Sequence, residues 1–79
     1  MINKHAHALA VAATKYFDHE RNADSESMTY IKQDYEDLMS IAQMIENDEK
    51  PEAIAKAMWK LDTLVRDVIP NSVYYTYCK

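Results

Sequence analysis

The sequence predicts an all-α protein, an antiparallel three-helix bundle that ends in a short C-terminal helix or an extended strap. Three features lead to this prediction. The 79 residues contain no glycine, so the tight hairpin turns that need glycine are disfavoured. Apolar residues recur at alternating steps of four and three along three segments, which is the period of an amphipathic helix. The connecting segments are short and contain the Asn, Asp and Pro residues that end helices.

The first predicted helix spans residues 3–18. Asn3 is a good N-cap residue, because its side-chain oxygen can accept a hydrogen bond from the first turn of the helix. One face carries Ile2, Ala6, Leu9, Ala13 and Tyr16, and the many alanines allow another helix to approach closely. The polar segment 18–27 is rich in capping residues and is predicted to be a surface loop.

The second predicted helix runs from Met28 to Glu46, with Ser25 or Ser27 as its cap. Its buried face is predicted to contain Ile31, Tyr35, Leu38, Ala42 and Ile45. A turn at residues 47–50 follows. Two long helices joined by such short connections favour an antiparallel arrangement.

The third predicted helix spans residues 51–68. Pro51 suits its first turn, where the missing N–H group costs nothing, and Pro70 stops it. Its stripe consists of Ile54, Met58, Leu61, Val65 and Val68. The tail that follows, residues 73–77, has the composition of a strand but no partner strand in the chain, so we expect a short helix or an extended strap.

Length and charge limit the role of the chain. Residues 1–79 are enough for one helical domain. The formal net charge of −4 argues against direct binding to nucleic acid or to an anionic membrane, because such binding depends on Lys and Arg neutralising phosphates. Cys78 is the single cysteine, which rules out an intramolecular disulfide and fits a reducing compartment. With no apolar run long enough for a membrane span, we expect a cytoplasmic protein.

No pattern indicates catalysis, a cofactor or a metal. Phosphate-binding loops of the common types need glycine. His5 and His7 lie about 200 degrees apart on a helix and cannot share one metal ion there. The serines occur at predicted caps or exposed helix positions. We therefore expect a protein that is not an enzyme.

Aromatic residues give the strongest functional signal. The chain has six tyrosines and one tryptophan, and Trp59 lies about 140 degrees from Ile54 around the helix, away from the apolar stripe. Either these rings complete a thin core, with Trp59 under the 18–27 loop or the C-terminal strap, or they form a protein-binding patch. In the second case, acidic residues would steer a basic partner. The predicted contact residues are Trp59, Arg66, Tyr30, Tyr74, Tyr75, Tyr77, Glu36 and Asp37.

One segment has a family resemblance. Residues 67–74, DVIPNSVY, resemble the C-terminal segment of the small helical Hha-type modulators, which act on nucleoid proteins. The resemblance covers eight residues, and the charge and spacing before them differ, so it implies no functional residues here. In its short, acidic, glycine-free and aromatic-rich character the chain also resembles small phage- or plasmid-borne proteins that bind and inhibit host machinery.

These observations lead to three hypotheses. The first is a non-enzymatic protein-binding module, a small inhibitor or regulator of phage or mobile-element type that docks on a host protein or nucleic-acid-handling complex. The second is a homodimeric structural or adaptor protein whose alanine-rich first helix contributes to a shared core. The third is a nucleic-acid-binding or nucleoid-associated transcriptional modulator.

Overall fold

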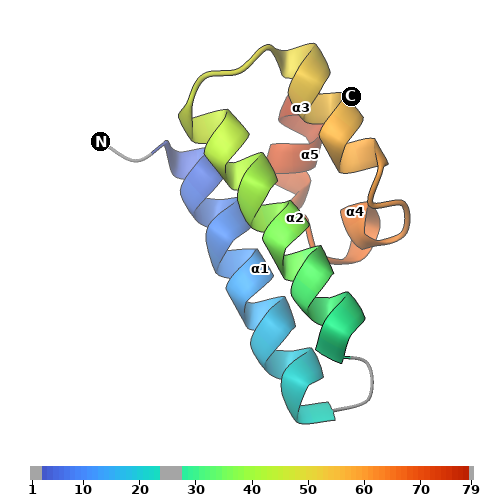
Figure 1. Cartoon of the computed structure of the whole chain (residues 1–79). Coiled ribbons are helices and arrows are strands. Elements are labelled where there is room, and N and C mark those ends of the chain that lie inside the picture. Colours follow the sequence, from blue (N-terminus) through green and yellow to red (C-terminus); the bar gives the residue numbers. More distant parts are fainter. Residues whose placement is uncertain (1–2, 24–27, 79) are drawn as a thin grey trace.

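Two long helices form the base of the structure, and three short helices lie on it (Figure 1). The computed structural model describes residues 3–23 and 28–78, without the side chains of 21–23 and 28–30. The helices are α1 Lys4–Ala23, α2 Met28–Glu46, α3 Pro51–Trp59, α4 Leu64–Asp67 and α5 Asn71–Tyr77. Within these ranges there is no strand, which confirms the all-α prediction. None of the described helices has the length and apolar character needed to cross a membrane.

Helices α1 and α2 lie side by side and run in opposite directions (Figure 1). Asn3 caps α1 as predicted, because its Oδ1 atom accepts a hydrogen bond of 2.8 Å from the N–H group of His5. The N–H group of Asn3 donates to Glu46 Oε2 at 2.7 Å and so ties the start of α1 to the end of α2. The predicted stripes face inward: the buried residues of this pair are Ala6, Leu9, Ala13, Ile31, Leu38, Ile41, Ala42 and Ile45.

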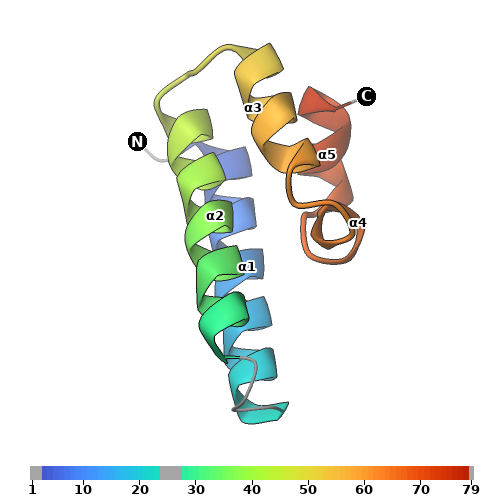
Figure 2. The ribbon, with the colours of Figure 1, turned by 45° about the vertical axis from the view of Figure 1, so that its right-hand side comes forward.

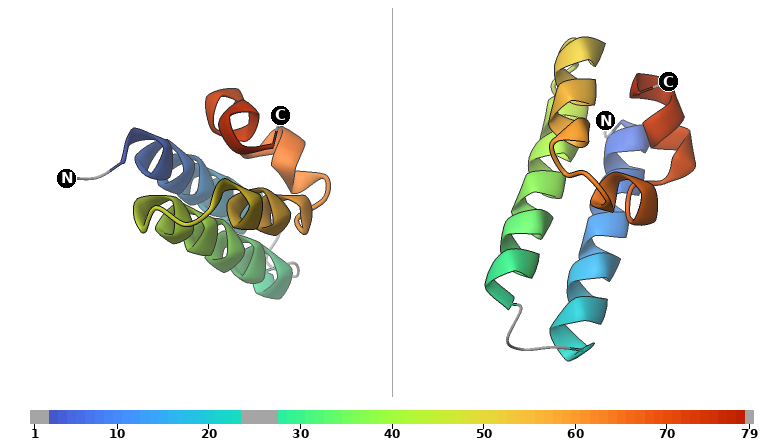
Figure 3. Two further views of the ribbon diagram at one scale, coloured as in Figure 1. Left: turned by 90° about the horizontal axis from the view of Figure 1, so that it is seen from above. Right: turned by 90° about the vertical axis from the view of Figure 1, so that its right-hand side faces the viewer.

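The short helices form a second layer over one half of this hairpin. Helix α3 packs against α2, α5 packs against α1, and α3 and α5 contact each other (Figure 3). The other half of the hairpin, where α1 ends and α2 begins, projects beyond the second layer (Figure 2). One apolar cluster joins the two layers, with Ile54, Met58, Val65, Ile69 and Val73 as the contribution of the second layer.

The predicted end of the first helix was wrong. Helix α1 continues to Ala23, into the segment predicted to be a loop. The added residues include Glu20, Arg21 and Ala23, and all three residue types are good helix formers. The predicted cap of α2 at Ser25 or Ser27 lies outside the described residues.

The predicted single third helix over residues 51–68 was also wrong, because it breaks after Trp59. Asp62 has a φ angle of 53°, in the left-handed region, and the hydrogen bonds around it span three residues rather than four. Asp62 and Thr63 are both weak helix formers. The break redirects the chain, so that α4 and the segment after it bring Val65 and Ile69 into the core.

The C-terminal segment is a helix rather than a strap. Pro70 has a φ of −56° and a ψ of 141°, and its carbonyl oxygen accepts hydrogen bonds from the N–H groups of Val73 and Tyr74 at 3.0 Å. Proline is therefore the residue from which α5 starts, and the preceding helix has already ended at Asp67. The side chain of Val73 is fully buried and anchors α5 to the core.

Candidate functional site

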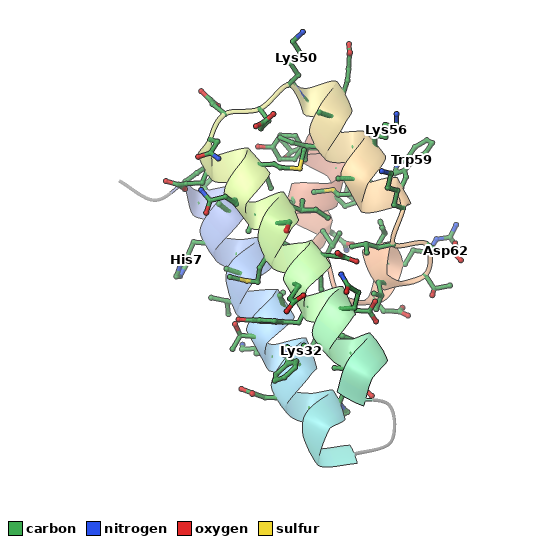
Figure 4. The ribbon with its side chains drawn as sticks, viewed as in Figure 1. His7, Lys32, Lys50, Lys56, Trp59 and Asp62 are labelled. Carbon is green, nitrogen blue, oxygen red and sulfur yellow. The ribbon has the colours of Figure 1, made fainter. Side chains whose placement is uncertain are left out.

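Trp59 ends helix α3 with its side chain directed outward (Figure 4). The side chain is 66% exposed, whereas Ile54 and Met58 of the same helix are buried. This agrees with its predicted place off the apolar stripe. Lys56 lies one turn earlier on the same face of α3, next to Trp59 in the figure.

The residue that follows α5 lies beside the end of α3. The Cys78 thiol donates a hydrogen bond of 3.5 Å to the sulfur of Met58, the residue before Trp59. Burial raises the pKa of the Cys78 thiol, and the hydrogen bond from Trp59 offsets part of that rise. The Trp59 ring is therefore close enough to Cys78 to affect the pKa of its thiol, while most of the ring stays exposed.

Two hollows lie side by side here, and the Trp59 ring borders the first of them. The first, of about 350 Å³, is lined by Trp59, Asp62, Thr63, Val65, Arg66 and Tyr74. The second, of about 200 Å³, is lined by Val65, Arg66, Asn71, Tyr74 and Tyr75. The two hollows share Val65, Arg66 and Tyr74 as a common wall. We call the residues that line them the Trp59 surface.

Tyr75 forms the far side of the second hollow. Its side chain is 58% exposed, and its ring meets that of Tyr74 edge-on, with centroids 5.6 Å apart. Tyr74 is half-buried and also packs against the core, so it supports the more exposed ring. The surface thus presents two exposed aromatic rings, Trp59 and Tyr75, with a half-buried one between them.

Arg66 is the cationic group of the Trp59 surface. Its side chain is exposed, and within the described part of the chain it makes no hydrogen bond or salt bridge. Asp62 shares the first hollow with it, whereas the second hollow has Arg66 as its one charged lining residue. Asp67, the next residue along the chain, lines a different hollow that also includes Lys15 of α1.

The structure therefore brings four of the eight predicted contact residues together: Trp59, Arg66, Tyr74 and Tyr75. Tyr77 lies elsewhere, half-buried, with its ring edge-on to His5 at 6.1 Å. Burial and the nearby charge of Asp48 raise the pKa of its hydroxyl. The side chain of Tyr30 lies outside the described residues.

The two predicted acidic residues also lie away from the Trp59 surface, on α2. Glu36 is exposed there. Asp37 accepts a 3.0 Å hydrogen bond from Gln33 Nε2 and lines a hollow between α2 and α3 that includes Lys60. Their carboxylates therefore belong to a different face from the exposed rings.

Four residues of the Trp59 surface were not among the predicted contact residues: Asp62, Thr63, Val65 and Asn71, of which Val65 was predicted to belong to the apolar stripe. Asp62 and Thr63 reach the first hollow because the helix breaks at that point, and the signal for this was the presence of two adjacent weak helix formers in a predicted helix. Asn71 reaches the second because the tail is a helix. No group of three or more His, Cys, Asp or Glu side chains suited to a metal ion occurs among the described residues.

The Trp59 surface offers aromatic rings, one guanidinium, one carboxylate, three hydroxyls and an amide. These groups provide apolar contact area and hydrogen bonding to a bound molecule. Comparisons with protein-family models, curated proteins and solved structures found no match to the chain.

Proposed function

We propose that this protein is a non-enzymatic protein-binding module and that the Trp59 surface is its contact site. The supporting observation is the exposure of Trp59. Among the described residues, the large apolar side chains that stay exposed are Trp59, Tyr75 and Val11. Trp59 borders the first of the two adjacent hollows and Tyr75 borders the second. Rings of this kind next to an arginine are the usual composition of an interface hot spot.

The energy available at this site suits protein binding. A tryptophan side chain carries a large apolar area, and burying the exposed part of Trp59 against a partner would contribute on the order of 3 kcal/mol. In its most specific form, the proposal is a small inhibitor or regulator of phage or mobile-element type that occupies a surface of a host protein.

A pull-down with matched variants tests the proposal. The wild type, Trp59→Ala and Val11→Ala are immobilised and exposed to bacterial lysate, and retained proteins are identified by mass spectrometry. Val11→Ala is the control because it shortens an exposed apolar side chain on α1. We expect a protein that the wild type and Val11→Ala retain equally and that Trp59→Ala loses. With the purified partner, Trp59→Ala should raise the dissociation constant about 30-fold or more.

Far-UV circular dichroism establishes that Trp59→Ala is folded, which its exposed position favours. Retention of the same proteins at the same level by all three baits would overturn the proposal. So would a wild-type bait that retains no protein above background.

A second candidate function, a homodimer, is favoured by a different observation. An open groove of about 300 Å³ between α1 and α2 is lined by Ala6, His7, Ala10, Met39, Ala42, Gln43 and Glu46. Its alanines would let a helix of a second copy approach closely, and His7 points away from the second layer (Figure 4). Sedimentation velocity over a range of concentrations tests this function, and a monomer throughout the micromolar range would exclude it.

A further inference from the structure

We propose that the segment bound by the Trp59 surface is a linear acidic segment of the partner, with an Asp or Glu carboxylate at Arg66 in the second hollow and an apolar side chain beside Trp59 in the first. This inference rests on the proposed function and specifies the chemistry of the partner. It replaces the basic partner expected from the sequence, because the acidic residues behind that expectation lie on α2, away from the exposed rings.

The guanidinium of Arg66 makes no hydrogen bond or salt bridge within the described part of the chain. An exposed arginine presents five N–H donors in a planar fork that matches a carboxylate. No described acceptor occupies the fork of Arg66, and Asp67, its neighbour in sequence, lines a hollow on the α1 side together with Lys15. The fork is therefore available to an external anion, and a paired, charge-assisted hydrogen bond is the strongest contact it can make.

The two hollows differ in charge and so suit different groups of the ligand. Asp62 lines the first hollow and would repel a carboxylate placed there. The second hollow contains no acidic residue and adds the amide of Asn71, a further donor, beside Arg66. The carboxylate therefore belongs in the second hollow. The first hollow, next to the exposed Trp59 ring, suits an apolar side chain.

The arrangement of the two hollows suits an extended peptide. The two hollows are adjacent and open, and they share the wall formed by Val65, Arg66 and Tyr74. In an extended peptide, side chains two residues apart point the same way and are about 7 Å from each other. An apolar residue and an acidic residue with one residue between them, in either order, would fill both hollows at once.

A selection from displayed peptides tests the sequence preference and does not require the partner to be identified first. Random linear peptides, displayed as internal segments so that no free C-terminal carboxylate is present, are selected on the immobilised wild type. We expect enriched sequences with Asp or Glu two residues from a bulky apolar residue. Enrichment of basic sequences, or of apolar sequences without an acidic residue, would overturn the inference.

A double-mutant cycle then assigns the acidic contact. The best peptide is made with both ends capped, and binding is followed by fluorescence of Trp59, the single tryptophan of the chain. Replacing the acidic residue of the peptide by its amide should weaken binding to the wild type about tenfold, which corresponds to about 1.4 kcal/mol. Against Arg66→Gln the same replacement should have little effect, and Arg66→Lys should recover part of the difference.

Lys32→Gln is the matched control, because it removes one exposed positive charge from α2, away from the Trp59 surface (Figure 4). An equal loss of affinity in Arg66→Gln and Lys32→Gln would mean that net charge alone matters, and this would overturn the inference. The proposed function is tested separately. If a protein partner depends on Trp59 but no acidic peptide is selected, the inference fails and the function stands; if neither is found, both fail.

Discussion

The α1–α2 hairpin and the α3–α5 layer use the same alternation of apolar residues in different ways. In the hairpin, helices of 20 and 19 residues continue one apolar stripe over their length, and the large apolar side chains described on them are buried or half-buried, with Val11 as the exception. In the second layer, helices of nine, four and seven residues each bury one or two side chains. Trp59 and Tyr75 lie on the outer sides of α3 and α5, outside the core. The long helices supply a continuous buried face, whereas the short helices carry the exposed aromatic surface.

The largest effect is expected from shortening a buried side chain in the apolar stripe of the hairpin. Leu38 is fully buried in the middle of α2, and Leu38→Ala should lower the free energy of unfolding by about 2–5 kcal/mol. For a chain this small, that is a large part of the total stability of roughly 4–12 kcal/mol. Urea unfolding followed by far-UV circular dichroism measures the loss. Gln43→Ala, an exposed change on the same helix, should stay within about 0.5 kcal/mol. Similar losses in both variants would contradict the assigned core.

A smaller loss is expected from the second layer. Val73 is the fully buried residue of α5, and Val73→Ala should cost about 1–3 kcal/mol through two lost methyl groups and the cavity they leave. Because one apolar cluster joins the two layers, unfolding curves from circular dichroism and from Trp59 fluorescence should coincide and shift together. An earlier fluorescence transition would show that the layers unfold separately. Ser72→Ala, an exposed change beside it, is the control.

Sequence periodicity was sufficient for the hairpin. The bounds of α2, the capping by Asn3 and the buried stripe were all predicted. A helix face that repeats every seven residues can be recognised from the local sequence, without knowledge of tertiary contacts. The prediction failed where local preferences compete. The end of α1 and the break at Asp62 depend on small differences in helix propensity and on what the rest of the chain gains by turning there.

The uncertainty about local conformation also decided which residues of the Trp59 surface could be predicted. The position of Trp59 follows from helical geometry alone, and its exposure agrees with that position. The sequence did not show which tail tyrosines are exposed, because a helix and an extended strap were both possible for residues 73–77. In a strand Tyr75 and Tyr77 would share one face, whereas in α5 Tyr77 comes four residues after the buried Val73 and falls on the inner side. Tyr75 is therefore exposed and Tyr77 is half-buried.

A gain of stability is expected from two substitutions, one in the turn between α2 and α3 and one in the turn between α3 and α4. Asp48 and Asp62 have φ angles of 61° and 53°, a region that costs energy for any residue with a Cβ atom. Asp62→Gly should therefore raise the free energy of unfolding by about 0.5–1 kcal/mol, and Asp48→Gly should do the same. Thr63→Gly is the matched contrast, because Thr63 has an ordinary φ of −63° and glycine should destabilise it. Thermal melting distinguishes the signs, and a loss of stability in both Asp variants would contradict the backbone conformation.

The smallest effect is expected in the hairpin, at Asp34. Burial raises the pKa of this carboxyl group, a hydrogen bond of 3.4 Å from the Tyr16 hydroxyl lowers it in part, and the charge of Asp37 raises it again. A raised pKa in the folded state means that folding favours the protonated form. Its stabilising contribution is complete below the pKa of the unfolded chain and is lost as the pH rises through the folded value.

Asp34→Asn keeps an acceptor for the Tyr16 hydroxyl but has no charge to bury. The variant should therefore gain stability relative to the wild type as the pH rises from about 3 to 7, by no more than about 0.5 kcal/mol because the site is only half-buried. Paired urea titrations at the two pH values measure the difference, in which the effects of all other groups cancel. A stability difference between Asp34→Asn and the wild type that stays constant from about pH 3 to pH 7 would show that the charge of Asp34 is not its cause.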